Sequence, residues 1–265
     1  MLSFNNLGNL GRLANQMFQY SSLKGIARNR GLDFVIPPEE VFGRNDIMVK
    51  NDPLNLYTVF DLKEEIGMRP NPVLAERMHE FDQELFDSCP DDVDLFGYYQ
   101  SAKYFEHIRD EIRSDFTFSN ETIKKCQEIV DDVLEKKDAI SIHIRRTDYK
   151  GNPNHPIQPI EYYDKALKSL PDNIPVVVFS DDPSWCHGNE FFVDDKFIIS
   201  ENNDADFDMC LMSKCKYHII ANSSFSWWGA WLADSEKIIA PKNWFAGDCV
   251  HKDTKDMAFG EWTWL

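Results

Sequence analysis

The sequence has little of what marks nucleic-acid-binding or membrane-spanning proteins. Its 265 residues include only 28 Lys and Arg against 45 Asp and Glu, which gives a formal net charge of −17. Proteins that bind nucleic acids or anionic membrane surfaces usually present a basic face, so this balance argues against both partners. No window approaches the roughly 18 apolar residues needed to span a bilayer. The first residues also lack the basic and apolar regions of a secretory signal peptide.

Paired cysteines are missing as well. The chain has six cysteines, and no two of them have the Cys-x-x-Cys spacing of a zinc site. Scattered cysteines in a chain of this length predict reduced thiols in a reducing compartment, and we expect a cytoplasmic protein. The six are Cys89, Cys126, Cys186, Cys210, Cys215 and Cys249.

Material for a packed core is plentiful. Hydrophobic residues make up 43% of the chain and aromatic residues 13%, which excludes global disorder. The length fits one large domain or two small ones. We place a boundary between domains near residues 115–138, and we divide the chain into residues 1–125 and 126–265.

The first third opens as a strand, a loop, a helix and a second strand. We expect strands at residues 2–4 and 32–36. Apolar residues at helical spacing predict a helix over residues 15–29, with Asn15 as its N-cap and Gly31 at its end. Residues 37–95 show few clear periods, and we expect loops, short helices and an insertion that faces the acceptor there.

The later part alternates strands and helices. Residues 139–145 alternate, with Ile140, Ile142 and Ile144 on one face and Ser141, His143 and Arg145 on the other. Further strands are predicted at residues 95–99, 176–179, 197–199, 218–221 and 237–240. Helices are predicted at residues 102–113, 120–137, 161–170, 204–216 and 226–233. This alternation predicts an α/β fold with parallel sheets covered on both faces.

Two adjacent arginines, Arg145 and Arg146, follow a predicted buried strand. Ligands of open α/β sheets bind beyond the carboxyl ends of the strands. The planar guanidinium fork suits phosphate oxygens, and a fixed positive charge stabilises a departing diphosphate. Asp148 could hold one guanidinium or act as a base. These residues therefore indicate a phosphate site, against the alternative of an ordinary surface ion pair.

A segment rich in serine, residues 222–229, follows a predicted strand and opens a helix. Hydroxyl and backbone N–H groups at a helix N-terminus form an anion site, and we expect Ser223, Ser224, Phe225 and Ser226 to contribute to it. A serine there also suits a plain N-cap. The large aromatics of the same segment have helical spacing and are expected in the core. They are Trp227, Trp228 and Trp231.

Two more segments contain candidate binding residues. After the strand at 176–179, Ser180, Asp181 and Asp182 could accept hydrogen bonds from a guanine base, or serve as loop or capping residues. Near the N-terminus, glycines in residues 8–11 permit close backbone approach to a ligand. The polar side chains beside them are Arg12, Asn15 and Gln16, which could reach across a cleft between domains.

The four segments together carry a family resemblance. Residues 11–20, Gly-Arg-Leu-Ala-Asn-Gln-Met-Phe-Gln-Tyr, resemble the opening signature of glycosyltransferase family 11, the α-1,2-fucosyltransferases. Residues 143–149, His-Ile-Arg-Arg-Thr-Asp-Tyr, resemble the His-x-Arg-Arg-Gly-Asp-Tyr motif of that family. Residues 179–182 and 222–229 resemble its Phe-Ser-Asp-Asp and Ser-Ser-Phe-Ser-Trp-Trp-Gly segments. All four occur in family order.

The resemblance implies a GT-B-like fold of two Rossmann-like domains with a cleft between them. Residues 1–125 would form the acceptor-side domain and residues 126–265 the GDP-fucose-binding domain. The implied reaction transfers fucose to a galactoside 2-hydroxyl with inversion and without a metal or other cofactor. The implied catalytic residues are His143, Arg145 and Asp148. The implied substrate-binding residues are Arg146, Ser180, Asp181, Asp182, Ser223, Ser224, Phe225, Ser226, Arg12, Asn15 and Gln16.

Two departures from the family pattern leave the linkage open. Ala14 and Thr147 both replace a usual glycine. Related α-1,6-fucosyltransferases also have threonine at the second position, so another linkage stays an alternative. Asp204 and Asp206 have the spacing of a metal-binding pair, but acids at a predicted helix start favour the helix dipole instead.

Two other classes of function compete with glycosyl transfer. Asn9-x-Gly11-x-x-Ala14 is an imperfect dinucleotide fingerprint, with Asp33 roughly where a ribose-binding acid would stand. An NAD-dependent oxidoreductase acting on sugar nucleotides would leave Arg145 and Arg146 unexplained. A carbohydrate-binding module would bind sugar without GDP.

Overall fold

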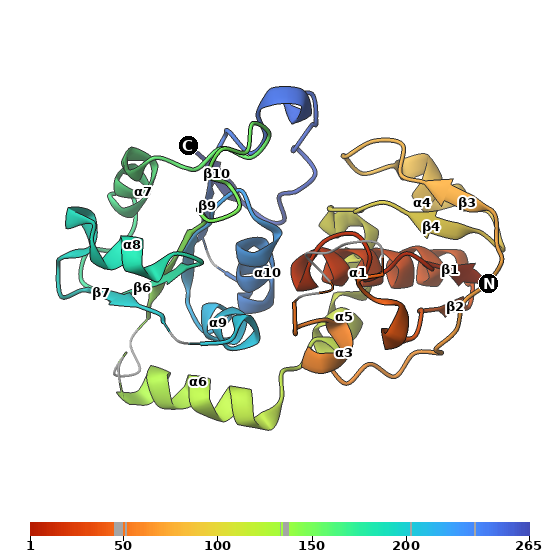
Figure 1. Cartoon of the computed structure of the whole chain (residues 1–265), viewed down its shortest axis with the longest axis horizontal. Helices are drawn as coiled ribbons and strands as arrows, with labels where there is room; N and C mark the ends of the chain where they lie inside the picture. The colour runs from red at the N-terminus through yellow and green to blue at the C-terminus, as the bar shows by residue number, and fades with distance from the viewer. Residues whose placement is uncertain (45–49, 51, 133, 135–137, 202, 236) are drawn as a thin grey trace. The chain divides into compact units, whose positions relative to one another are not determined.

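The computed structural model describes residues 1–44, 50, 52–132, 134, 138–201, 203–235 and 237–265. The chain forms two compact units, which Figure 1 shows together with the element labels. Unit 1 consists of Met1–Phe118 and Lys252–Phe259, and unit 2 of Ser119–His251 and Gly260–Leu265. The units divide the chain after Phe118, inside the range 115–138 given above for the boundary and seven residues before the division at 125, and a late segment of the chain also belongs to unit 1.

Unit 1 is built on a four-stranded parallel sheet with strand order β2-β1-β4-β3. Its strands are β1 (Leu2–Ser3), β2 (Phe34–Val35), β3 (Val73–Ala75) and β4 (Asp94–Phe96). The predicted strands at 2–4, 32–36 and 95–99 are present but shorter. Residues 37–95 contain the expected loops and short helices. They also contain β3, an exposed edge strand without a clear alternating pattern, which was not predicted.

Helix α1 (Leu13–Arg30) packs against this sheet (Figure 1). It is buried along most of its length. It begins two residues earlier than predicted, with Arg12 rather than Asn15 at the N-cap, and it ends at Gly31 in the left-handed conformation. Gly25 allows a close approach, because a Cβ there would lie 2.0 Å from the carbonyl oxygen of Tyr104.

The remaining elements of unit 1 are short. The predicted helix over 102–113 is instead two 3-10 turns followed by one α-helix. Asp256 anchors the late segment to the unit, since it accepts the Phe81 N–H at 3.1 Å and the Ser101 hydroxyl donates to its carbonyl at 2.7 Å. The elements are η1 (Glu39–Val41), α3 (Leu56–Val59), α4 (Gln83–Ser88), η2 (Ala102–Tyr104), η3 (Glu106–Ile108) and α5 (Arg109–Asp115).

Unit 2 contains a six-stranded parallel sheet with strand order β10-β9-β8-β5-β6-β7. The predicted strands are all present, which confirms the α/β class with parallel sheets. The added strand β10 at the C-terminal end was not predicted. The strands are β5 (Ile140–Ile144), β6 (Val176–Ser180), β7 (Phe197–Ile199), β8 (Tyr217–Ile219), β9 (Lys237–Ala240) and β10 (Trp262–Trp264).

Helices cover both faces of this sheet (Figure 1). Ile140, Ile142 and Ile144 pack with Tyr163 and other residues of α7 in one core cluster, while His143 contacts α10 from the opposite face. The alternation predicted for β5 therefore separates an apolar face from the face that holds the polar residues. The helical elements are α6 (Asn120–Asp132), α7 (Ile160–Leu167), α8 (Pro183–His187), η4 (Glu190–Phe192), α9 (Ala205–Met212), α10 (Ser224–Ala233) and η5 (Gly247–Cys249).

Helix α10 is fixed by its aromatic side chains. Trp227, Trp228 and Trp231 are fully buried, which confirms the prediction that they belong to the core. Gly229 lets α10 approach α9, because a Cβ there would lie 2.8 Å from Met212 Cβ. The N-terminus of α10 is thereby held rigidly at the edge of the sheet.

Candidate functional site

Arg145 directly follows β5 at the carboxyl edge of the six-stranded sheet. Its guanidinium is 2.7 Å from Asp148 Oδ2 and 3.3 Å from Asp181 Oδ2, with 17% of the side chain exposed. Burial opposes the charge, but the two carboxylates outweigh it and raise the pKa of Arg145. The side chain is thus a fixed, permanent positive charge at the edge where ligands of such sheets bind.

Arg146 is held by different partners. Its guanidinium lies 3.8 Å from the centre of the Trp185 ring, and its Nε is 3.5 Å from Asp182. Asp182 also pairs with Lys150 at 2.8 Å. Stacking and ion pairing on one side chain indicate that Arg146 stabilises the loop after β5.

Asp181 shapes the turn that presents these arginines. Its carboxylate accepts the backbone N–H of Arg146 at 2.8 Å and of Thr147 at 3.0 Å, together with the Thr147 hydroxyl. Burial opposes ionisation, yet the Arg145 charge and these donors lower the pKa of Asp181. These bonds show that Asp181 holds the turn that follows β5. The Ser180 hydroxyl accepts the Asp182 N–H at 3.0 Å.

The serine-rich turn, residues 222–226, meets the loop that holds Arg145 and Arg146. His143 Nδ1 is 2.9 Å from the Ser226 hydroxyl, and the Tyr149 hydroxyl donates to the Asn222 carbonyl at 2.8 Å. Ser223 caps α10 by accepting the Phe225 N–H at 3.3 Å. These bonds join the segments 143–149 and 222–226 into one site.

His143 is neutral in this setting. Burial, followed by the Arg145 charge, lowers the pKa of His143 to about 3. An imidazole with so low a pKa is a weak base near neutral pH. The ring instead holds the Ser226 hydroxyl and contacts the Phe225 ring at 5.6 Å between centroids.

Asn222 and Gln158 form an amide clamp that sequence reasoning missed. The Asn222 amide donates to the carbonyls of Pro156 at 3.1 Å and Trp244 at 3.0 Å. Gln158 donates to the Asn222 side chain at 3.1 Å and to the Asn243 carbonyl at 3.0 Å. Asn222 stood in the predicted segment, but its partners lie 22 to 66 residues away and no local pattern identifies them.

Asp208, at the same edge, was also missed. It lies in α9, and its Oδ1 accepts the Ser200 hydroxyl at 2.6 Å just after β7. Burial raises the pKa of Asp208 to about 6, and the charges of Asp206 and Asp204 add to the effect. A carboxyl group with so perturbed a pKa at a ligand-binding edge is a candidate functional group.

The three predicted residues of the N-terminal segment lie in unit 1. Arg12 is exposed and lies 3.6 Å from Asp52. Asn15 accepts the Gln100 amide at 2.8 Å. Gln16 is buried; it donates to the Gly11 carbonyl at 3.3 Å and accepts the Leu56 N–H at 3.2 Å. Its bonds within unit 1 indicate that Gln16 supports the loop before α1.

The described part of the chain has no cluster of three or more His, Cys, Asp or Glu side chains that could hold a metal ion. Asp204 and Asp206 flank the start of α9, as the sequence predicted for a helix N-terminus. Among the described residues, no helix is both long and apolar enough to cross a membrane.

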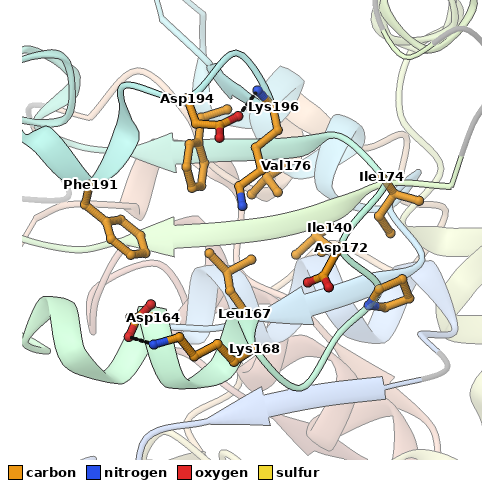
Figure 2. A pocket seen from close by; sticks show the side chains of 12 residues that line it. Ile140, Asp164, Leu167, Lys168, Asp172, Ile174, Val176, Phe191, Asp194 and Lys196 are labelled. Carbon is orange, nitrogen blue, oxygen red and sulfur yellow. Dashed lines mark hydrogen bonds and ion pairs between the residues drawn. The ribbon is translucent and has the colours of Figure 1, made fainter.

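A pocket of about 250 Å³ lies at the opposite edge of the six-stranded sheet (Figure 2). Ile140, Val176 and Phe197, the first residues of β5, β6 and β7, line it. Its rim includes an ion pair between Asp164 and Lys168 at 2.6 Å. Because ligand sites in parallel sheets form at the carboxyl ends of strands, this amino-end pocket is a poor active-site candidate.

Comparison with known proteins shows what the chain resembles. A family model described as Glycosyl transferase family 11 matches residues 3–265. An α-1,2-colitosyltransferase of Escherichia coli is 34% identical over 266 residues, covering 89% of this chain and 90% of the relative. Galactoside α-(1,2)-fucosyltransferase 1 of Plecturocebus brunneus is 24% identical over 249 residues, covering 86% of this chain and 65% of the relative.

A similar solved structure is that of NodZ, an α-1,6-fucosyltransferase soaked with GDP-fucose. It matches with a TM-score of 0.57 at 12% identity, covering 93% of this chain and 96% of NodZ. A likeness at this identity shows the fold, and it confirms the expected GT-B-like α/β class.

Proposed function

Because the chain belongs to glycosyl transferase family 11, we propose that it transfers fucose from GDP-fucose to a galactoside 2-hydroxyl, with inversion at the anomeric carbon. The observation that supports this most directly is Arg145. It is held by two carboxylates at the carboxyl edge of β5 and linked through its loop to the N-terminus of α10. The names of the two relatives support the α-1,2 linkage.

Departure of GDP is the step this geometry serves. As the bond between the anomeric carbon and the β-phosphate oxygen breaks, negative charge grows on the diphosphate. The Arg145 guanidinium neutralises that charge, and backbone N–H groups at the start of α10 add the positive end of a helix dipole. Both partners are positioned before the reaction, so little reorganisation is needed in the transition state.

Neighbouring side chains hold the Arg145 loop and the N-terminus of α10 in position. His143 holds the hydroxyl of Ser226, and Asp181 holds the turn at Arg146 and Thr147. Ser223 is the N-cap of α10, with its own N–H bonded to the Ala221 carbonyl at 2.8 Å, and Ser224 begins the helix and contributes its first N–H. Each of these acts by placing the phosphate-binding groups.

Asp148 has two proposed tasks. One oxygen, Oδ2, orients Arg145, and the carboxylate takes the proton of the attacking acceptor hydroxyl. Its side chain is 39% exposed, so a sugar hydroxyl can reach it.

Colitose is a second candidate for the transferred sugar, because a relative at 34% identity is a colitosyltransferase. Colitose is fucose without its 3-hydroxyl, so the two sugars place the same demands on a diphosphate site. Only contacts with the 3-hydroxyl would let the protein distinguish fucose from colitose. A site that hydrogen-bonds this hydroxyl would reject colitose.

The test is transfer by the purified protein with lactose and N-acetyllactosamine as acceptors. GDP-fucose and GDP-colitose are compared as donors, with EDTA present and absent, and products are identified by mass and linkage analysis. We expect a 2-O-fucosyl product and no loss of rate in EDTA, because Arg145 supplies the positive charge. A metal requirement would contradict the proposed role of Arg145. Thermal stabilisation by NAD but not by GDP would favour the oxidoreductase instead.

A further inference from the structure

The carboxyl edge of the four-stranded sheet in unit 1 brings together residues that no motif predicted. Glu76 directly follows β3, and residues 97–100 follow β4, its neighbour in the sheet (Figure 1). Ligands of parallel sheets bind at this edge. The edge is therefore the natural place in unit 1 for a second substrate.

A strained turn after β4 marks this edge. Tyr99 has a φ of 52°, an unusual value for a bulky side chain. Glu76 holds the turn, since its carboxylate accepts the N–H of Tyr98 at 2.8 Å and of Tyr99 at 2.9 Å. Strain that the surroundings maintain occurs preferentially at functional sites.

Exposed apolar side chains accompany the turn. Phe96 is 41% exposed and Tyr98 37% exposed, and both stand at the carboxyl end of β4. Beside them, the Gln100 amide donates to Asn15 at 2.8 Å, which ties the turn to the start of α1. The edge thus combines aromatic faces with a carboxylate and an amide.

This combination suits a neutral sugar. A sugar ring has an apolar C–H face, which stacks on aromatic side chains, and a rim of hydroxyl groups, which bond to carboxylate and amide groups. The Glu76 carboxylate would repel a diphosphate, so the edge differs chemically from the Arg145 site. We propose that Glu76, Phe96, Tyr98 and Gln100 bind the acceptor sugar. The inference rests on the proposed function and names a site for its second substrate.

Gly97 allows Glu76 to reach the turn. A Cβ at Gly97 would lie 2.4 Å from Glu76 Cβ, so Gly97→Ala would displace the carboxylate. This change perturbs the acceptor site without removing any of its side chains, which makes it an independent test of the Glu76 position.

The experiment compares Phe96→Ala, Tyr98→Ala and Gly97→Ala with wild type. Val73→Ala is the matched control, because Val73 is 64% exposed and lies at the amino end of β3. Steady-state rates with lactose or N-acetyllactosamine yield KM for the acceptor and KM for GDP-fucose. Hydrolysis of GDP-fucose without acceptor and thermal stabilisation by GDP report on the donor site, and circular dichroism reports on folding.

We expect each aromatic replacement to raise the acceptor KM by about 10-fold, the loss of one stacking contact. The KM for GDP-fucose, donor hydrolysis and GDP stabilisation should stay within about twofold of wild type in all folded variants, and Val73→Ala should change nothing. An unchanged acceptor KM in both aromatic variants overturns the inference while leaving the proposed function intact. A wild-type protein that neither binds GDP nor modifies either sugar overturns the proposed function and the inference with it.

Discussion

Replacing Arg145 with alanine is the sharpest test of the proposed chemistry. The change removes the guanidinium that Asp148 and Asp181 hold at 2.7 and 3.3 Å. It leaves the turn intact, because Asp181 still accepts the N–H groups of Arg146 and Thr147. The variant should therefore separate catalysis from folding.

The expected losses of activity and of stability differ in size. Loss of a preorganised group that stabilises transition-state charge costs about 3–4 kcal/mol, a decrease in kcat of roughly 10²- to 10³-fold. The lost ion pairs cost far less, about 1 kcal/mol, because Asp148 is 39% exposed and Asp181 keeps its other donors. For a chain of this size, 1 kcal/mol lowers Tm by only about 2–4 °C.

Arg146→Ala is the matched control. It removes an equal charge from the next position, but one that stacks on Trp185 at 3.8 Å and pairs with Asp182. We expect a larger loss of Tm than in Arg145→Ala and a smaller loss of kcat. Three quantities are measured for each variant: the rate of GDP release in the presence of excess acceptor, the affinity for GDP, and Tm. If Arg145→Ala keeps kcat within about threefold of wild type, the assignment of Arg145 as the group that neutralises departing GDP is wrong.

Two further substitutions test the carboxylates of unit 2. Asp148→Asn keeps an oxygen for Arg145 but cannot take a proton, so kcat should fall by about 10²-fold or more with KM for GDP-fucose nearly unchanged. The control is Asp138→Asn, which changes an exposed ion pair with Lys216 and should have no effect on activity. Equal activity of the two variants would exclude Asp148 as the base. The folded-state pKa of Asp208, about 6, lies above the ordinary value of 3.8, so its contribution to stability is complete below about pH 4 and is lost as pH rises through 6. Asp208→Asn should therefore raise Tm at pH 7.5 but not at pH 4, and a Tm difference that does not change with pH would show that the pKa of Asp208 is not raised in the folded protein.

Much of the site around β5 was predictable because its signals are local. The alternating residues of β5, the arginines that follow it and the hydroxyl groups at the start of α10 each depend on neighbours in sequence. In a parallel sheet the carboxyl ends of all strands lie at one edge, so the segments that follow β5 and β8 are expected at the same edge. In the structure, the bonds of His143 and Tyr149 connect residues 143–149 with residues 222–226.

Individual roles within the site were less predictable. Asp181 and Asp182 were expected to bind guanine or cap a helix, and the structure shows them holding the arginine loop. Gln16 was expected to reach a ligand, and it is buried with bonds to Gly11 and Leu56. A polar side chain in a motif has the same local pattern whether its partner is a ligand or the backbone, so sequence cannot choose between them.

The sequence alone determined the α/β class, the parallel alternation of the later strands and the segments that meet at the carboxyl edge of the six-stranded sheet, because strand period and helix capping depend on residues close together in the chain. Tertiary structure decided the edge strand β3, the Asn222–Gln158 clamp, the raised pKa of Asp208 and the turn that Glu76 supports. Each of these depends on burial or on a hydrogen bond to a distant residue, such as the 22 positions from Glu76 to Tyr98. Burial and distant partners exist only once the chain has folded, and they set the conformation and charge of these groups.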